Sequence, residues 1–263
     1  MAQTDLAAIR TFNRYELKYL LDRTALARVR PELSFRLDAD PYGDAGSYLV
    51  WSRYYDTYDL RCYWEKIDGI KFRRKLRIRH YGAPHELTAD APAWVEIKQR
   101  LNRVTQKRRA RLSYRQAIAL CAGRDIDGVD PRDEAVVEEV QRLVGDFDLR
   151  PSTVLGYVRE AMVGRESDAG LRVTFDARIR ARDRDLDLAL EGENRYIVHP
   201  DLRVMEVKVN ERVPYWLTEL IARNNLQLVR MSKYCQSVEA FDGKPRSLYH
   251  SRDEDLYEME SDS

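Results

Sequence analysis

The pattern of residues 71–82, KFRRKLRIRHYG, most constrains how this chain can fold. From its middle onward a basic residue occupies every second position, at Lys75, Arg77 and Arg79, with an apolar residue in between. Successive side chains of a β-strand point to opposite faces, so the pattern predicts a strand with one basic face and one apolar face. On its own, such a strand is typical of a protein surface, where water solvates the charges.

The same opposition of a charged and an apolar face recurs in five other segments. They lie at residues 14–19, 94–98, 107–111, 172–176 and 205–209. Six such strands are compatible with two folds. An open antiparallel sheet would leave every charged face in water, whereas a closed barrel covered by helices would gather the charges in a wet interior. In a closed barrel, Glu16, Glu96 and Glu206 would hold a hard divalent metal or neutralise lysines.

Helix signals occur between these strands. Residues 22–30 have helical spacing, with Asp22 as a predicted N-cap and Pro31 as the predicted end. Residues 131–144 begin with a proline, carry acids in the first turn and precede Gly145, the order expected of a helix. The chain therefore mixes strands and helices, which predicts an α+β protein.

Composition sets the domain boundaries and the compartment. The formal net charge of the 263 residues is only +1, and no composition break divides residues 1–240, which we predict to be one domain. Residues 241–263 carry seven acidic side chains against three basic ones, which predicts a flexible acidic tail. Three widely spaced cysteines argue for reduced thiols and a cytoplasmic protein. No apolar run reaches the roughly 20 residues of a membrane helix.

Six short motifs occur in a fixed order along the chain. They are YELKY at 15–19, YYDT at 54–57, LRIRHYG at 76–82, VEIK at 95–98, MEVK at 205–208 and MSKY at 231–234. With these motifs, residues 12–240 resemble the polyphosphate polymerase (VTC) domain of the vacuolar transporter chaperone family. That family is a branch of the CYTH, or triphosphate tunnel metalloenzyme, superfamily. The resemblance implies a closed antiparallel β-barrel of about eight strands with helices packed outside.

The resemblance also implies roles for individual residues. Those implied to act in catalysis are Arg77, Arg79, Lys98 and Lys233. Those implied to bind phosphate or nucleotide are Lys18, Lys107, Arg109, Tyr157, Arg159, Arg172, Lys208, Arg230 and Ser232. The basic cluster at 107–111 leaves open whether Lys107 or Arg109 makes the contact. A divalent metal, Mn²⁺ or Mg²⁺, is implied at Glu206, with Glu16 or Glu96 as a second ligand.

One position departs from the superfamily pattern of two glutamates and a lysine at alternate positions of the first strand. Here these positions are Arg14, Glu16 and Lys18, so a base replaces the first acid. Because superfamily hydrolases use the acids to hold metal, this departure disfavours a hydrolase and favours the polymerase branch. The implied reaction transfers the terminal phosphoryl group of ATP to a growing chain of inorganic polyphosphate.

Two other functions remain open at this stage. A metal-dependent triphosphatase would use the same interior with water as the acceptor. A non-catalytic sensor would bind triphosphate or polyphosphate without turnover. Nucleic-acid binding is disfavoured, because aromatic residues do not interleave the basic strands as stacking platforms. Some relatives belong to membrane complexes, so a membrane partner is also left open.

Overall fold

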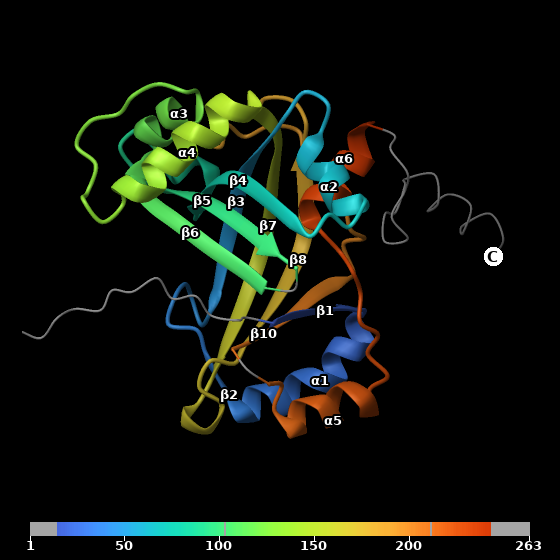
Figure 1. Ribbon diagram of the computed structural model, residues 1–263. Helices are drawn as coiled ribbons and strands as arrows, with labels where there is room; N and C mark the ends of the chain where they lie inside the picture. Colours follow the sequence, from blue (N-terminus) through green and yellow to red (C-terminus); the bar gives the residue numbers. More distant parts are fainter. Residues whose placement is uncertain (1–14, 103, 211, 243–263) are drawn as a thin grey trace, which may run out of the picture.

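The computed structural model describes residues 15–102, 104–210 and 212–242. Within them, the path β1-β10-β8-β7-β3-β4-β5-β6 forms an antiparallel sheet, to which β2 adds beside β7 and β9 beside β8 (Figure 1). The strands are β1 Tyr15–Leu21, β2 Leu37–Ala39, β3 Ser47–Asp56, β4 Phe72–Tyr81, β5 Pro92–Leu101, β6 Val104–Ser113, β7 Arg150–Gly164, β8 Arg172–Arg182, β9 Arg195–Tyr196 and β10 Arg203–Val209. The helices are α1 Arg23–Arg36, α2 Arg61–Ile67, α3 Tyr114–Cys121, α4 Glu134–Phe147, α5 Tyr215–Arg223 and α6 Lys233–Asp242, with short 3₁₀ turns at Pro84–Glu86 and Glu166–Asp168.

The predicted closure of the barrel is not seen. Among the described residues, β1 and β6 are the two ends of the strand path and do not pair with each other. The sheet nevertheless curls back on itself, because Lys98 on β5 forms an ion pair of 3.2 Å with Glu16 on β1. Two long charged side chains join these strands, which a backbone ladder would hold only about 4.8 Å apart. The α+β class and the main path of eight strands are confirmed, and the strand ladder is open.

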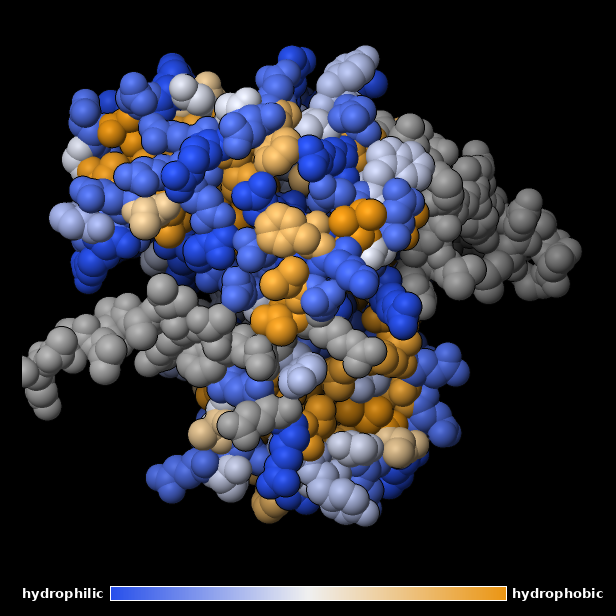
Figure 2. All heavy atoms as spheres, in the orientation of Figure 1, coloured by the Kyte–Doolittle hydropathy of each residue, from blue (hydrophilic) through white to orange (hydrophobic). Residues whose placement is uncertain are grey.

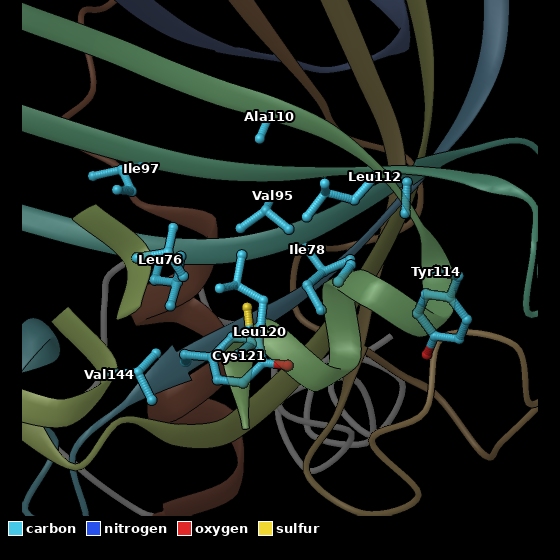
Figure 3. Packing of buried hydrophobic residues seen from close by; sticks show 14 of the residues in the cluster. Leu76, Ile78, Val95, Ile97, Ala110, Leu112, Tyr114, Leu120, Cys121 and Val144 are labelled. Carbon is cyan, nitrogen blue, oxygen red and sulfur yellow. The ribbon is translucent and has the colours of Figure 1, made fainter. Parts of the chain in front are cut away.

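The two faces of the sheet differ as the alternation predicts. Leu76 and Ile78 of β4 and Val95 and Ile97 of β5 are buried in one apolar cluster. Figure 3 shows these side chains pointing toward α3 and α4, together with residues of β6. The opposite face of the same strands carries the charged residues and is called the inner face here. Apolar burial under helices therefore fixes which face turns inward.

Two helix pairs, α3 with α4 and α1 with α5, cover the outer side of the sheet, whereas α6 packs against its inner face with α2 beside it. Helices α3 and α4 cover β4, β5 and β6, α1 lies beside α5 below β1 and β10, and α2 contacts α6 (Figure 1). The face seen in Figure 2 is mostly hydrophilic over α3 and α4, with hydrophobic residues interspersed. These helices thus bury their apolar faces against the sheet and turn polar faces to water.

Two predicted helix boundaries were wrong. Asp22 caps α1 as predicted, accepting a hydrogen bond of 2.6 Å from the Ala25 backbone N–H. The helix continues through Pro31 to Arg36, because burial of Val29 and Leu33 outweighs the backbone hydrogen bond that proline cannot donate.

Helix α4 was also predicted with the wrong ends. It begins at Glu134 rather than at the proline, and it continues past Gly145 to Phe147. Its C-cap is Asp148, which has a left-handed backbone with φ 46°. The sequence did not predict α6, which extends past the predicted domain boundary at 240. The acidic residues 243–263 and Arg14 lie outside the described residues.

Candidate functional site

Arg77 is held at the centre of the inner face by a carboxylate and a phenol. Its Nε and Nη2 donate hydrogen bonds of 2.8 and 2.6 Å to Oε2 of Glu96, and its Nη1 donates one of 2.8 Å to the hydroxyl of Tyr54. Glu96 lies directly opposite Arg77 in the pairing of β4 with β5, and Tyr54 lies opposite it in the pairing with β3. Strand register alone therefore brings these three side chains together.

Arg79 lies two residues further along β4 and is buried. Its Nε donates a hydrogen bond of 3.1 Å to the Ser52 hydroxyl, and its Nη2 donates one of 3.2 Å to the Tyr157 hydroxyl. Tyr157 comes from β7, which is not a neighbour of β4 in the sheet. The contact shows that the inner face is concave, because side chains reach across it. Neutral hydroxyls hold this guanidinium on two sides, so it keeps charge available for an anion.

One buried glutamate serves three cations in this part of the inner face. Glu96 is 1% exposed and contacts Arg77, Arg79 and the ammonium group of Lys107. Burial alone would raise the pKa of Glu96, but the three cations lower it by more than burial raises it. The carboxylate is therefore ionised.

A second buried glutamate, Glu206 on β10, is surrounded by four cations. Its Oε1 lies 3.4 Å from Lys18 and 2.8 Å from Lys233, and its Oε2 lies 2.7 Å from Lys208 and 3.5 Å from Arg159. Burial raises the pKa of Glu206, but the surrounding cations bring it well below its usual value.

Asp176 on β8 is the partner that completes this second group. It is fully buried and accepts two hydrogen bonds of 2.7 Å from Arg159, in the bidentate arrangement that guanidinium and carboxylate favour. Lys233, the first residue of α6, lies 2.5 Å from Oδ2 of the same carboxylate. The carboxylate therefore anchors α6 to the inner face.

Positive charge exceeds negative charge across the whole network. Among the described residues, eight basic side chains and four carboxylates form its ion pairs, which leaves a formal excess of four positive charges when all of them are ionised. Burial lowers the pKa of Lys107 to about 7 and that of Lys208 to about 8. The basic residues are Lys18, Arg77, Arg79, Lys98, Lys107, Arg159, Lys208 and Lys233, and the acids are Glu16, Glu96, Asp176 and Glu206. Desolvating so much like charge is costly without a counter-ion, so the arrangement suits a multiply charged anion.

The structure distinguishes between Lys107 and Arg109, the two residues of β6 that the sequence left as alternative phosphate contacts. Lys107 contacts the carboxylate of Glu96 and belongs to the network. Arg109 instead stacks over the ring of Trp94, with its guanidinium carbon 4.1 Å from the ring centroid. Lys107 is therefore the better placed of the two to meet an anion at the centre of the inner face.

Besides Arg109, three predicted binding residues lie outside this network. Arg172 pairs with Asp40 and donates a hydrogen bond of 3.0 Å to the Tyr48 hydroxyl. The hydroxyl of Ser232 accepts a hydrogen bond of 3.4 Å from the Cys235 backbone N–H in the first turn of α6. Arg230 is exposed in the segment before α6.

Sequence reasoning assigned no role to several side chains that the site uses. Ser52 and Tyr54 alternate along β3 with outward-facing residues, and this spacing was a signal that could have placed both on the inner face. The sequence also did not predict that Asp176 would be a buried ion-pair partner.

The three predicted metal ligands do not converge. Glu16 and Glu206 both contact the ammonium of Lys18, at 3.1 and 3.4 Å, whereas Glu96 lies among the arginines. In the part of the chain that the structure describes, no three acidic, histidine or cysteine side chains form a group that could hold a metal. Glu206 and Glu16 are the pair whose oxygen donors suit a hard divalent cation.

The comparison with protein families decides the assignment. A family model for the VTC domain matches residues 13–242. The chain belongs to the VTC domain family. The match covers the whole inner-face network and α6, so the resemblance seen in the sequence motifs is confirmed. The comparison with curated proteins gave no match.

Solved structures with a similar arrangement share little sequence with this VTC domain. A candidate adenylate cyclase from Bacillus halodurans is 14% identical, with a TM-score of 0.49, over 87% of this chain and 98% of the other. A candidate adenylyl cyclase from Hippeastrum, described as having a dominant triphosphatase activity, is 16% identical, with a TM-score of 0.48, over 90% of this chain and 99% of the other. None of the helices in the described ranges is long and apolar enough to cross a membrane.

Proposed function

We propose that this VTC domain is a polyphosphate polymerase. It transfers the terminal phosphoryl group of ATP to the end of an inorganic polyphosphate chain and releases ADP. The observation that carries the proposal is the excess of four positive charges on a concave, largely buried face. Both substrates and the transferred group are polyanions, and fixed cations stabilise the charge that spreads over the phosphoryl oxygens during transfer.

The residues divide the work by their chemistry. Arg77 and Arg79 offer planar guanidinium groups fixed by Glu96 and by hydroxyls, so they orient the phosphoryl group that moves. Lys98 and Lys233 supply ammonium groups that act as point charges on the phosphate oxygens. In the transfer, an oxygen of the terminal phosphate of the acceptor bonds to the γ-phosphorus of ATP. The bond to the bridging oxygen breaks and its electron pair leaves with ADP.

The remaining basic residues bind rather than react. Lys18, Arg159 and Lys208 surround Glu206. A bound anion would take the place of this carboxylate as the partner of these cations. A divalent cation, Mn²⁺ or Mg²⁺, would be held by Glu206 and Glu16 and would supply further charge neutralisation on the phosphate oxygens when bound. The Tyr157 hydroxyl, which accepts a hydrogen bond from Arg79, lies beside the same space.

The decisive experiment follows two products at once. Purified protein is incubated with ATP and Mn²⁺, and ADP and long-chain polyphosphate are measured together. Polymer that forms in step with ADP supports the polymerase. Release of ADP and free phosphate without polymer identifies a triphosphatase, and tight triphosphate binding without turnover identifies a sensor.

A pair of variants on one strand tests the role of the inner face. Arg79→Gln removes an inner-face guanidinium, and we expect polymer synthesis to fall by about 100-fold or more, as for loss of one fixed transition-state donor. Arg74→Gln removes the same charge from the opposite face of β4, where Arg74 lies over the Phe147 ring, and is expected to keep activity. Equal activities of the two variants would exclude Arg79 from the reaction.

The setting of the reaction is also part of the proposal. We place it in the cytoplasm, where ATP is available and thiols stay reduced. Cys62, Cys121 and Cys235 are all buried as free thiols. ATP and inorganic polyphosphate are the proposed binding partners, with no role for nucleic acid.

A further inference from the structure

Four basic residues at one end of the inner face form a cluster without acidic partners. Arg73 and Lys75 lie near the start of β4, Arg100 lies near the end of β5, and Lys66 approaches from α2. Arg73 is directly opposite Arg100 in the strand register, and Lys75 is directly opposite Lys98. Like charges directly opposite one another on neighbouring strands are destabilising. We call Lys66, Arg73, Lys75 and Arg100 the acid-free cluster.

The contrast with the centre of the inner face is a matter of register. There, acid faces base: Arg77 is opposite Glu96, Lys18 is opposite Glu206, and Arg159 is opposite Asp176. Each of these central cations is neutralised in part by the protein itself. Four residues further toward the start of β4, the same alternation continues, but the positions opposite are basic.

The contacts of the acid-free cluster are all to neutral groups. Lys75 Nζ lies 3.4 Å from the Ser232 hydroxyl and 4.5 Å from the centre of the Tyr234 ring. Arg73 donates to the carbonyl of Ile70, and Arg100 donates a hydrogen bond of 2.9 Å to the carbonyl of Asn102. Throughout the described ranges, no carboxylate forms an ion pair with any of the four.

The nearby acid does not compensate this charge. Glu65 acts electrostatically on Arg73, but its carboxylate already pairs with Arg61 at 2.9 Å. Burial lowers the pKa of Lys66, and Arg73, Lys75 and Arg100 lower it further. The pKa of Arg73 is lowered too, by burial and by Arg100. The four charges therefore repel one another in the free protein, and an anion would relieve that repulsion.

We propose that the acid-free cluster is a second phosphate-binding subsite, which holds a polyphosphate chain beyond the three phosphates at the centre of the inner face. Arg73 and Arg79 are six residues apart on β4, a span of about 20 Å at the rise of a strand. That span exceeds the length of a triphosphate, so one triphosphate does not use both ends of the basic strand. A longer chain lying along β4 uses both.

The subsite rests on the proposed function for its ligand, and it would give the protein a preference for polymer over triphosphate. The test compares inorganic triphosphate with long-chain polyphosphate as probes, each titrated into metal-free protein. The variant Arg73→Gln/Arg100→Gln removes two charges from the acid-free cluster. The control Arg74→Gln/Arg142→Gln removes two charges from the outer side of β4 and from α4.

We expect the cluster variant to lose affinity for long-chain polyphosphate by about 10-fold or more, since each charged hydrogen bond contributes about that much. Its affinity for triphosphate should fall far less, so the ratio of the two affinities drops. The control should keep the wild-type ratio. An unchanged ratio in the cluster variant, or an equal loss for both probes, would overturn the subsite.

The outcome can be separated from the fate of the polymerase proposal. If the wild-type protein makes no polymer but the cluster variant still shows the drop in ratio, the subsite stands and the enzyme assignment fails. If the protein makes polymer and the ratio does not change, the assignment stands and the subsite fails. Thermal unfolding of both variants confirms that each remains folded.

Discussion

At the level of single residues, the inner face works by giving each carboxylate more cations than it can neutralise. Glu96 has three cationic neighbours and Glu206 has four. Burying an ion pair costs desolvation energy, which proteins seldom spend without a functional return. The glutamates neutralise part of this positive charge, and the remainder is available to an anion.

Tyr54 gives a pH dependence to this arrangement. Burial alone would raise the pKa of its phenol, but Arg77 and Arg79 have the larger, opposite effect, and the resulting pKa is about 8. The folded protein therefore gains stability from the Tyr54 phenolate as pH rises from about 8 to 10, and this gain is lost as pH falls through 8. Phenolate charge opposes an anionic ligand, so we expect affinity for triphosphate to fall above pH 8.

Tyrosine absorbance measures this titration directly. The difference between wild-type protein and Tyr54→Phe isolates one phenol among the 16 tyrosines. Bound triphosphate competes for the arginines and should raise the pKa of Tyr54 by about one unit. A difference spectrum with a midpoint near pH 10, unmoved by triphosphate, would contradict the prediction.

Among the elements of the fold, the strands were predictable from sequence and α6 was not. Alternation at residues 75–79 is enough to assign Arg77 to one face and Leu76 to the other, because strand geometry has a period of two. Alternation does not identify the partner across a sheet. Lys233 and Asp176 are 57 positions apart in sequence, and their contact depends on how α6 packs against β8.

The open edge between β1 and β6 was missed for the same reason. The pattern of each strand is identical in a closed and an open barrel, so only the packing of the whole sheet decides. Pro31 and Gly145 did not end their helices. The free energy that each residue costs inside a helix is smaller than the free energy gained by burying apolar side chains in a longer helix. Local sequence patterns therefore predicted which face of each strand is apolar, whereas packing between distant segments determined where the helices end.

Besides the ion pairs of Lys233, a buried hydrogen bond of Tyr234 holds helix α6 and can be removed by a single substitution. The Tyr234 hydroxyl donates to Oδ2 of Asp56. The same carboxylate accepts from the backbone N–H of Cys62 at Oδ1, at 2.8 Å, and from that of Tyr63 at Oδ2, at 3.2 Å. Tyr234→Phe should destabilise the protein by about 1–3 kcal/mol, because a hydrogen bond to a buried carboxylate is lost. That corresponds to a fall in Tm of about 3–10 °C.

The matched control for this prediction is Tyr58→Phe, whose side chain is 90% exposed and should leave the Tm unchanged. Because α6 also carries Lys233, the Tyr234→Phe variant should bind triphosphate more weakly as well. Equal Tm values for the two variants would show that the bond to Asp56 does not hold the helix.

For the whole molecule, the small net charge does not reveal the uneven distribution of charge. The chain as a whole carries a formal charge of +1, yet its inner face holds an excess of four positive charges. Acids elsewhere on the molecule balance this excess, which is why composition did not indicate a polyanion site. The free protein therefore stores electrostatic repulsion in its centre, and a bound polyanion should stabilise the entire fold.

Thermal unfolding with and without inorganic triphosphate measures that stabilisation. At a ligand concentration about 100 times the Kd, binding adds about 2.7 kcal/mol, which raises the Tm by about 5–10 °C for a chain of this size. Sulfate at equal ionic strength controls for screening of charge and should raise the Tm much less, since one small anion cannot reach both the cations around Glu96 and the cations around Glu206. An equal rise with sulfate would mean that general screening, rather than a site for linked phosphates, relieves the repulsion.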